Sequence, residues 1–280
     1  MQTEGLRTEL ANRVLVVTLD RAEKKNALTV AMRLALEELC ARVDADPEVD
    51  VVLLTATDPV FSAGVDIREV GAQGTSMRPT DPGRALRSVR KPVVVAVNGA
   101  CVSGALEIAL SCDFIVASER ARFADTHARL GALPRWGLSA LLPRAVGLAK
   151  AKEMTLTGNF VDAAEALRIG LVNRVVPHER LRDEALALAA DIVSSDARAV
   201  VGSLDLYDRG AGLSLAEALA LEEKVSLAWQ VDTAEFAARR GAVTARGSAQ
   251  QDGGLSGGST SRNGASHRGA SGSGSSKPRA

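Results

Sequence analysis

One acidic side chain stands in an otherwise apolar stretch, NGACVSGALEIALSCD at residues 98–113. Glu107 follows Gly104 by three residues, so both lie on one face if a helix begins near the glycine. An ionised carboxylate in apolar surroundings is costly unless it is paired, and beside an activated carbonyl it can move protons at carbon. The stretch therefore predicts an acid–base residue. The alternative is a glutamate that only stabilises a helix dipole.

Two loops that are poor in bulky side chains follow predicted buried strands. They are FSAGVDIREV at 61–70 and NGACVSGALEIA at 98–109. In a parallel sheet both loops open at the carboxyl edge, where ligand sites gather. Small residues let a ligand approach main-chain N–H groups, and two such groups aimed at one point form an oxyanion hole. The same pattern also fits ordinary glycine-rich turns.

Apolar runs separated by helical patterns must position these loops. Strands are predicted at 13–21, 50–57, 91–99 and 113–119, all of them rich in Val, Leu and Ile. Thr29 is a plausible N-cap for a helix that carries apolar residues at helical spacing. These residues are Met32, Leu36, Leu39, Cys40 and Val43. Strands of this kind indicate a sheet covered on both faces, so the fold class is α/β.

The pattern turns helical after residue 137 and changes again near the C-terminus. Helices are expected near 196–209, 214–228 and 233–240. Residues 247–280 hold nine Gly and nine Ser but one large aliphatic residue, so we expect a disordered tail. The predicted parts are an α/β core at 1–180, a C-terminal helical region at 181–246 and the tail at 247–280.

Composition and charge exclude several classes of protein. The 280 residues are 46% hydrophobic and 24% charged, as in globular proteins, and the formal net charge is zero. The tail carries four basic residues against one acidic residue, which is too weak a signal to predict a nucleic-acid partner. Three cysteines without a CxxC motif argue against a disulfide framework or a zinc site. No apolar run approaches the ~18 residues of a membrane span, and no signal segment is recognisable, so we expect a cytoplasmic protein without a membrane partner.

Several motifs together point to a family. DRAEKKNALT, FSAGVDI, NGACVSGALEIALSCDFIVASERARFADTHARLG and RAVGLAKAKEMTLTG resemble, in order and spacing, the enoyl-CoA hydratase/isomerase (crotonase) superfamily. DAAEALRIGLVNRVV continues a match that covers roughly residues 8–243. The resemblance implies a spiral core of ββα repeats and a helical C-terminal region used in trimerisation. It also implies an acyl-CoA thioester substrate and a trimer or dimer of trimers, with no metal or other cofactor because coenzyme A is part of the substrate.

The resemblance also assigns roles to individual residues. The oxyanion hole of the family falls on the main-chain N–H groups of Val65 and Gly104. Ala63, Gly64 and Asp66 complete the first substrate loop, and the first catalytic glutamate matches Glu107.

One position departs from the pattern of the family's hydratases. They carry a second catalytic glutamate in a segment like F-x-x-P-E, whereas FADTHARLG at 123–131 places His127 there. A histidine can supply a proton near neutral pH, so His127 is a candidate catalytic residue. Pocket lining is the alternative. Asp125 is a possible orienting partner or substitute acid, or a turn residue.

Other polar and aromatic residues admit weaker interpretations. Ser103 lacks the G-x-S-x-G context of an activated nucleophile. Lys24 and Lys25 lie in a loop that the resemblance places near the nucleotide of CoA, although a solvated surface explains them equally well. Trp136 replaces small residues common in hydratases at this loop, where it narrows the acyl pocket or simply packs. His178 marks a helix start.

These observations predict a hydro-lyase that adds water to a 2-enoyl-CoA thioester in fatty acid or related acyl-CoA metabolism. Glu107 would activate the water, and His127 would handle the α-proton. A Δ3,Δ2-enoyl-CoA isomerase and a non-catalytic acyl-CoA binding protein stay open as alternatives. Acyl chain length, pathway and the function of the tail do not follow from the sequence.

Overall fold

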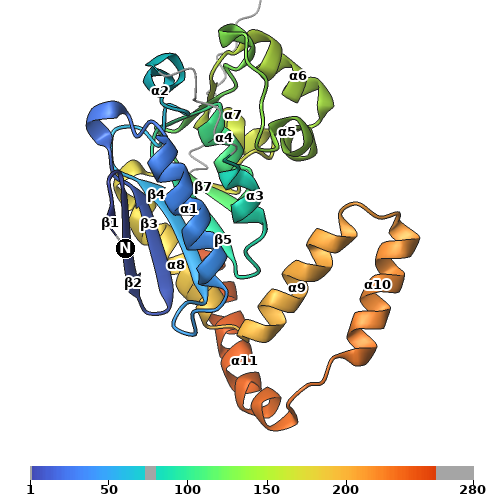
Figure 1. Cartoon of the computed structure of the whole chain (residues 1–280). Coiled ribbons are helices and arrows are strands. Elements are labelled where there is room, and N and C mark those ends of the chain that lie inside the picture. The colour runs from blue at the N-terminus through green and yellow to red at the C-terminus, as the bar shows by residue number, and fades with distance from the viewer. Residues whose placement is uncertain (1, 73–79, 257–280) are drawn as a thin grey trace, which may run out of the picture. The chain divides into compact units, whose positions relative to one another are not determined.

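The computed structural model of the chain describes residues 2–72 and 80–256 (Figure 1). The described residues form two compact units, which meet in sequence between Leu221 and Glu222. The first unit contains both β-sheets and the candidate site, and the second contains the end of one helix and the whole of the last one.

A seven-stranded sheet forms the centre of the first unit. Its middle strands pair in parallel, whereas the two N-terminal strands form antiparallel pairs. In sheet order the strands are β1 (Gln2–Thr3), β2 (Leu6–Ala11), β3 (Val14–Leu19), β4 (Val51–Ala56), β5 (Val93–Val97), β7 (Phe114–Ser118) and β10 (Arg174–Val176). The four strands predicted from apolar runs are confirmed as β3, β4, β5 and β7, with slightly shorter bounds.

Both faces of this sheet are covered, as its continuous apolar strands predicted. One face packs on α1 (Val30–Val43) and on further apolar residues of the core. The other face packs on α8 (Leu181–Val193), through a cluster that joins Val16, Leu53 and Val94 to Leu181. The predicted cap of α1 is confirmed, because the Thr29 hydroxyl accepts the Met32 N–H at 3.1 Å.

A small three-stranded sheet leads into two of the segments that the sequence singled out. It consists of β6 (Ala100–Val102), β8 (Arg122–Ala124) and β9 (Val161–Asp162). Strands β6 and β8 run parallel with Val102 opposite Ala124. The segments that leave these two strands therefore start side by side. One of them leads to Gly104 and the other to Asp125.

The remaining helices surround the sheets or follow them in the chain. They are α2 (Ile67–Ala72), α3 (Pro82–Arg87), α4 (Gly104–Ala109), α5 (Leu138–Val146), α6 (Leu148–Thr157), α7 (Ala163–Arg168), α9 (Ala197–Gly210), α10 (Leu215–Ala228) and α11 (Thr233–Ser256), with 3-10 turns η1 (Ala22–Lys24), η2 (Ala128–Leu130) and η3 (His178–Arg180). No helix in the described part of the chain is long and apolar enough to cross a membrane.

Two elements differ from the sequence-based expectation. Helix α8 packs against the central sheet of the core, although the sequence assigned residues from 181 onward to a separate helical region. Helix α11 continues to Ser256, ten residues into the predicted disordered tail. Ala, Arg and Gln before residue 252 are strong helix formers and extend α11. The rest of the predicted tail, 257–280, lies outside the described residues, and the three-part division stays a prediction.

Candidate active site

The predicted substrate loop lies against the start of α4. Gly64 has a φ of +88°, and a Cβ atom there would lie 2.8 Å from the Val102 carbonyl oxygen and 3.5 Å from the Gly104 nitrogen. Only glycine fits such a position. The Val65 side chain in turn reaches within 3.4 Å of the Cβ position of Gly104. The structure therefore brings together the two loops that the sequence singled out.

Two main-chain N–H groups at this junction have no acceptor within the described chain. The Leu28 N–H donates to the Gly64 carbonyl, and the Leu28 carbonyl accepts the Asp66 N–H. The N–H of Val65, which lies between them, therefore faces away from Leu28. The N–H groups of Val65 and Gly104 donate no hydrogen bond to any described residue. Ser103, just before Gly104, has φ 48° and ψ −107°. Such strained backbone persists where the surroundings enforce it, commonly at functional sites.

A buried asparagine holds the substrate loop in place. The Asn26 side chain donates to the carbonyls of Thr57 and Val60, each at 2.8 Å, and accepts the Arg21 N–H at 2.8 Å. The Asn26 carbonyl accepts the Ser62 hydroxyl at 2.7 Å. Sequence reasoning missed Asn26, because a single polar residue in a turn gives no sign that it will be buried.

The other loop residues take part in its anchoring as well. Ala63 is exposed and donates its N–H to the Lys25 carbonyl at 3.0 Å. Asp66 is buried and bonds the Arg21 guanidinium at 2.7 Å, which holds the pKa of Asp66 below its ordinary value. The carboxylate of Asp66 therefore stabilises the loop through its ion pair with Arg21. Lys24 and Lys25 are both exposed.

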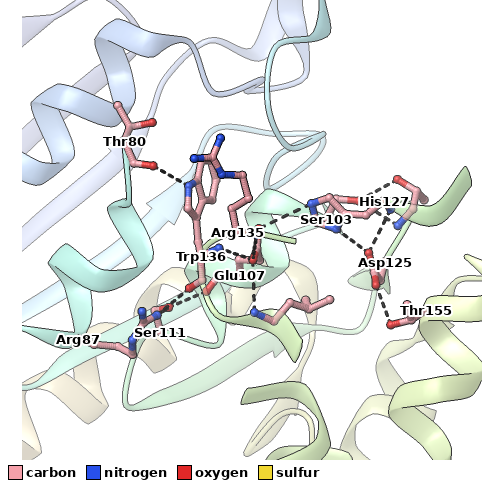
Figure 2. Close-up of polar contacts among 12 residues, drawn as sticks. Thr80, Arg87, Ser103, Glu107, Ser111, Asp125, His127, Arg135, Trp136 and Thr155 are labelled. Carbon is pink, nitrogen blue, oxygen red and sulfur yellow. Dashed lines mark hydrogen bonds and ion pairs between the residues drawn. The ribbon is translucent and has the colours of Figure 1, made fainter. Parts of the chain in front are cut away.

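Glu107 is buried and its two carboxylate oxygens have different surroundings (Figure 2). Oε1 accepts the N–H groups of Trp136 at 2.7 Å, Arg135 at 3.1 Å and Leu138 at 3.3 Å. Oε2 lies 3.6 Å from Nε2 of His127. Burial raises the pKa of Glu107, and the three N–H donors and His127 only partly oppose it. One oxygen is thus fixed and the other faces His127.

His127 is held by Asp125 on the opposite side of its ring. Nδ1 of His127 lies 2.7 Å from Oδ1 of Asp125, whose other oxygen accepts the Thr155 hydroxyl at 2.7 Å. Burial acts to raise the pKa of Asp125, but these hydrogen bonds outweigh it and leave the pKa below its ordinary value. An ionised Asp125 keeps a proton on Nδ1 and leaves Nε2 to face Glu107. Oδ1 of Asp125 also accepts the main-chain N–H of His127 at 3.1 Å, so the contacts fit both the orienting role and the turn role that the sequence left open for Asp125.

The structure separates the other candidates from this cluster. The Ser103 hydroxyl bonds the side chain of Thr126 at 2.8 Å and its N–H at 2.9 Å, so it is engaged by Thr126 rather than His127. His178 begins η3 and bonds Ser118 and Asp58. Within the described residues, no group of three or more His, Cys, Asp or Glu side chains could hold a metal ion.

Two main-chain N–H donors, a buried carboxylate and a histidine on an α/β core are groups that acid–base chemistry at a carbonyl can use. Residues 9–238 match the Enoyl-CoA hydratase/isomerase family, and the chain belongs to this family. The family prediction and the crotonase-like α/β fold class are therefore confirmed.

Curated relatives and solved structures agree with this assignment. The chain is 38% identical over 229 residues to a probable enoyl-CoA hydratase of Rhizobium meliloti, covering 80% of this chain and 89% of that protein. It is 36% identical to the short-chain-enoyl-CoA hydratase of Clostridium acetobutylicum, covering 80% and 88%. The crystal structure of enoyl-CoA hydratase from Mycobacterium tuberculosis aligns with a TM-score of 0.70 and 45% identity, covering 78% of this chain and 95% of that one.

Proposed function

We propose that this protein adds water to a 2-enoyl-CoA thioester and acts as an enoyl-CoA hydratase. The observation that carries the proposal is the facing pair of Glu107 Oε2 and His127 Nε2, 3.6 Å apart. Glu107 lies on α4, the helix that begins at Gly104, whose N–H has no acceptor among the described residues. Membership of the family and relatives named as hydratases support the choice of substrate class.

The thioester carbonyl binds between the N–H groups of Val65 and Gly104. These donors stabilise the negative charge that develops on the oxygen as water adds to the β-carbon, and one such donor is typically worth about 2.7–4 kcal/mol. Main-chain hydrogen bonds to Leu28 on both sides of Val65 and the start of α4 at Gly104 fix the directions of the two N–H groups before the charge appears.

Glu107 and His127 divide the proton transfers. The water oxygen bonds the β-carbon while Oε2 of Glu107 takes one of its protons, and Nε2 of protonated His127 gives a proton to the α-carbon. The cycle leaves Glu107 protonated and His127 neutral. Exchange with water then takes the proton from Oε2 of Glu107 and returns one to Nε2 of His127, which restores both groups. A carboxylate–histidine pair thus does the work that two glutamates do in the pattern of the family's hydratases.

The test is product analysis with trans-2-enoyl-CoA and cis-3-enoyl-CoA substrates. Hydration predicts a product heavier by one water from the trans-2 substrate, which mass spectrometry detects. A shifted double bond without added water would instead identify an isomerase. Binding without turnover of either substrate would identify an acyl-CoA binding protein.

A further inference from the structure

Trp136 lies against the main chain of the proposed oxyanion hole. A Cβ atom built on Gly104 would lie 2.8 Å from Cζ3 and 3.5 Å from Cε3 of the indole ring. The ring edge therefore occupies the space that a side chain at position 104 would take. We propose that Trp136 closes the acyl site beside Gly104 and makes the enzyme selective for short acyl chains. This inference rests on the proposed hydratase function.

The indole ring is fixed on several sides. Its Nε1–H donates to the Thr80 carbonyl at 2.8 Å, and its main-chain N–H donates to Glu107 at 2.7 Å. The main-chain carbonyl of Trp136 accepts an N–H of the Arg87 guanidinium at 2.8 Å. Figure 2 shows these contacts reaching Trp136 from separate segments of the chain. Trp136 is 5% exposed, so its ring is a packed wall and not a mobile lid.

A buried arginine supports the face of the ring. The guanidinium carbon of Arg33 lies 5.7 Å from the ring centroid, within the range of a cation–π contact. Nη1 of Arg33 bonds the Thr80 hydroxyl at 2.7 Å, so Arg33 and Trp136 are both tied to Thr80. Movement of the indole away from Gly104 would break the bond to Thr80 and the contact with Arg33 together.

The chemistry places the first acyl carbons next to this wall. The thioester oxygen must reach the Gly104 N–H, and the α- and β-carbons must reach His127 and Glu107. The indole edge packs against Gly104, whose N–H holds the thioester oxygen, so the first acyl carbons lie beside the ring. Methylene groups further along the acyl chain then contact the indole ring of Trp136. A methylene that a pocket does not fit changes kcat/KM by about 10–200-fold.

The first experiment compares kcat/KM for crotonyl-CoA and for trans-2-enoyl-CoAs of eight and twelve acyl carbons. We expect the wild type to lose at least about 10-fold on the longer substrates. Trp136→Leu should reduce or reverse this preference, whereas Trp136→Phe keeps an aromatic wall and should preserve it. Equal kcat/KM across the series in the wild type, or an unchanged preference in folded Trp136→Leu, would overturn the proposal.

A second experiment does not depend on turnover or on the folding of a Trp136 variant. The chain has two tryptophans, so Trp229→Phe leaves Trp136 as the sole indole. Titration with butyryl-CoA should change its emission, and coenzyme A without an acyl group should not. The same emission change with both ligands would overturn the proposal. An emission change specific to butyryl-CoA, together with no hydration of any enoyl-CoA, would overturn the hydratase function and leave the acyl contact of Trp136 intact.

Discussion

The proposed role of the buried Glu107 carboxylate as a base predicts that activity depends on pH. Glu107 acts as a base only when ionised, and burial raises its pKa above the ordinary value of 4.5. We therefore expect kcat/KM to fall on the acidic side, with a midpoint above 4.5. A pH–rate profile of the wild type measures this midpoint. A rate that stays constant down to pH ~4, below the ordinary value, would contradict a raised pKa of the base.

The same raised pKa has a consequence for stability. Between the unfolded and folded pKa of Glu107, the native state binds more protons than the unfolded state, so the free energy of unfolding falls as pH rises through this window. Glu107→Gln cannot ionise and escapes this loss. We expect the variant to gain stability relative to the wild type between pH 4.5 and neutral pH, as measured by urea unfolding. The same change in the free energy of unfolding with pH in both proteins would contradict a raised pKa of Glu107.

In the proposed mechanism, Asp125 acts through His127. Asp125→Asn removes the charge that keeps a proton on Nδ1, and the new amide can donate to this nitrogen and favour the wrong tautomer. We expect kcat to fall by about 10²–10⁴-fold, the range for an acid–base group. Thr155→Val is the matched control, because it removes one hydrogen bond from Asp125 and keeps its charge. The control should show a smaller loss in kcat and a pH–rate profile of wild-type shape. Near-normal kcat in Asp125→Asn would show that His127 needs no orientation by Asp125.

At the scale of the element, the fit of the substrate loop against β6 depends on Gly64. Gly64→Ala adds strain at positive φ and a clash at 2.8 Å with the Val102 carbonyl, so the Val65 N–H must shift. A misplacement of about 1 Å can cost 10²-fold in rate, and we expect a loss of this size in kcat/KM.

Gly170→Ala is the control for this substitution. Gly170 has a φ of +79°, but its Cβ position meets only the Ala145 carbonyl oxygen at 3.4 Å. The control should carry a similar backbone strain and keep its activity, and circular dichroism should show that both variants fold. Equal kcat/KM in the two variants would contradict a role for the close approach at Gly64.

Apolar patterning predicted most of the core elements but not the edges. The strand β5 reads VVVAV and is buried along its whole length, so its sequence alone predicts it. The strand β2 has one buried residue in six and alternates irregularly, so no run predicts it. Its hairpin with β3 depends on positive φ at Asn12 and Arg13, and only Asn12 favours such a conformation by its chemistry.

Candidate site residues could be predicted from the sequence where their side chains suggest chemistry. Contacts that the main chain makes could not be predicted. A lone acid and two glycine-containing loops pointed to Glu107 and Gly104, whereas Val65 was assigned through the family resemblance. The three N–H donors to Glu107 come from a segment 28–31 residues further along the chain and have no residue-type signature. A main-chain donor can belong to any residue except proline, so sequence spacing could not reveal it.

At the scale of the whole molecule, the C-terminal helices α9 and α10 leave apolar side chains uncovered. Neither helix has a buried residue. Tyr207, Leu215 and Leu219 are exposed by 76%, 77% and 56%. Apolar surface of this kind commonly marks an interface, and closed symmetry is the usual outcome. We therefore predict a homo-oligomer, and a trimer or dimer of trimers is the state that the family resemblance implies.

Light scattering of the wild type and of a double variant tests this prediction. Leu215→Glu combined with Leu219→Glu should dissociate the oligomer, because both charges would be buried without partners. Lys224→Glu on the exposed surface of α10 changes the net charge by the same amount and should leave the oligomer intact. A wild type that is monomeric in dilute solution would contradict the prediction.

Hydration of crotonyl-CoA by Glu107→Gln tests whether Glu107 is the base. The amide keeps the shape of the side chain and an oxygen for the N–H groups of Trp136 and its neighbours, but it cannot take a proton from water. We predict that kcat falls by about 10²–10⁴-fold, while butyryl-CoA binds with an affinity close to that of the wild type. Wild-type turnover by the folded Glu107→Gln variant would contradict the account.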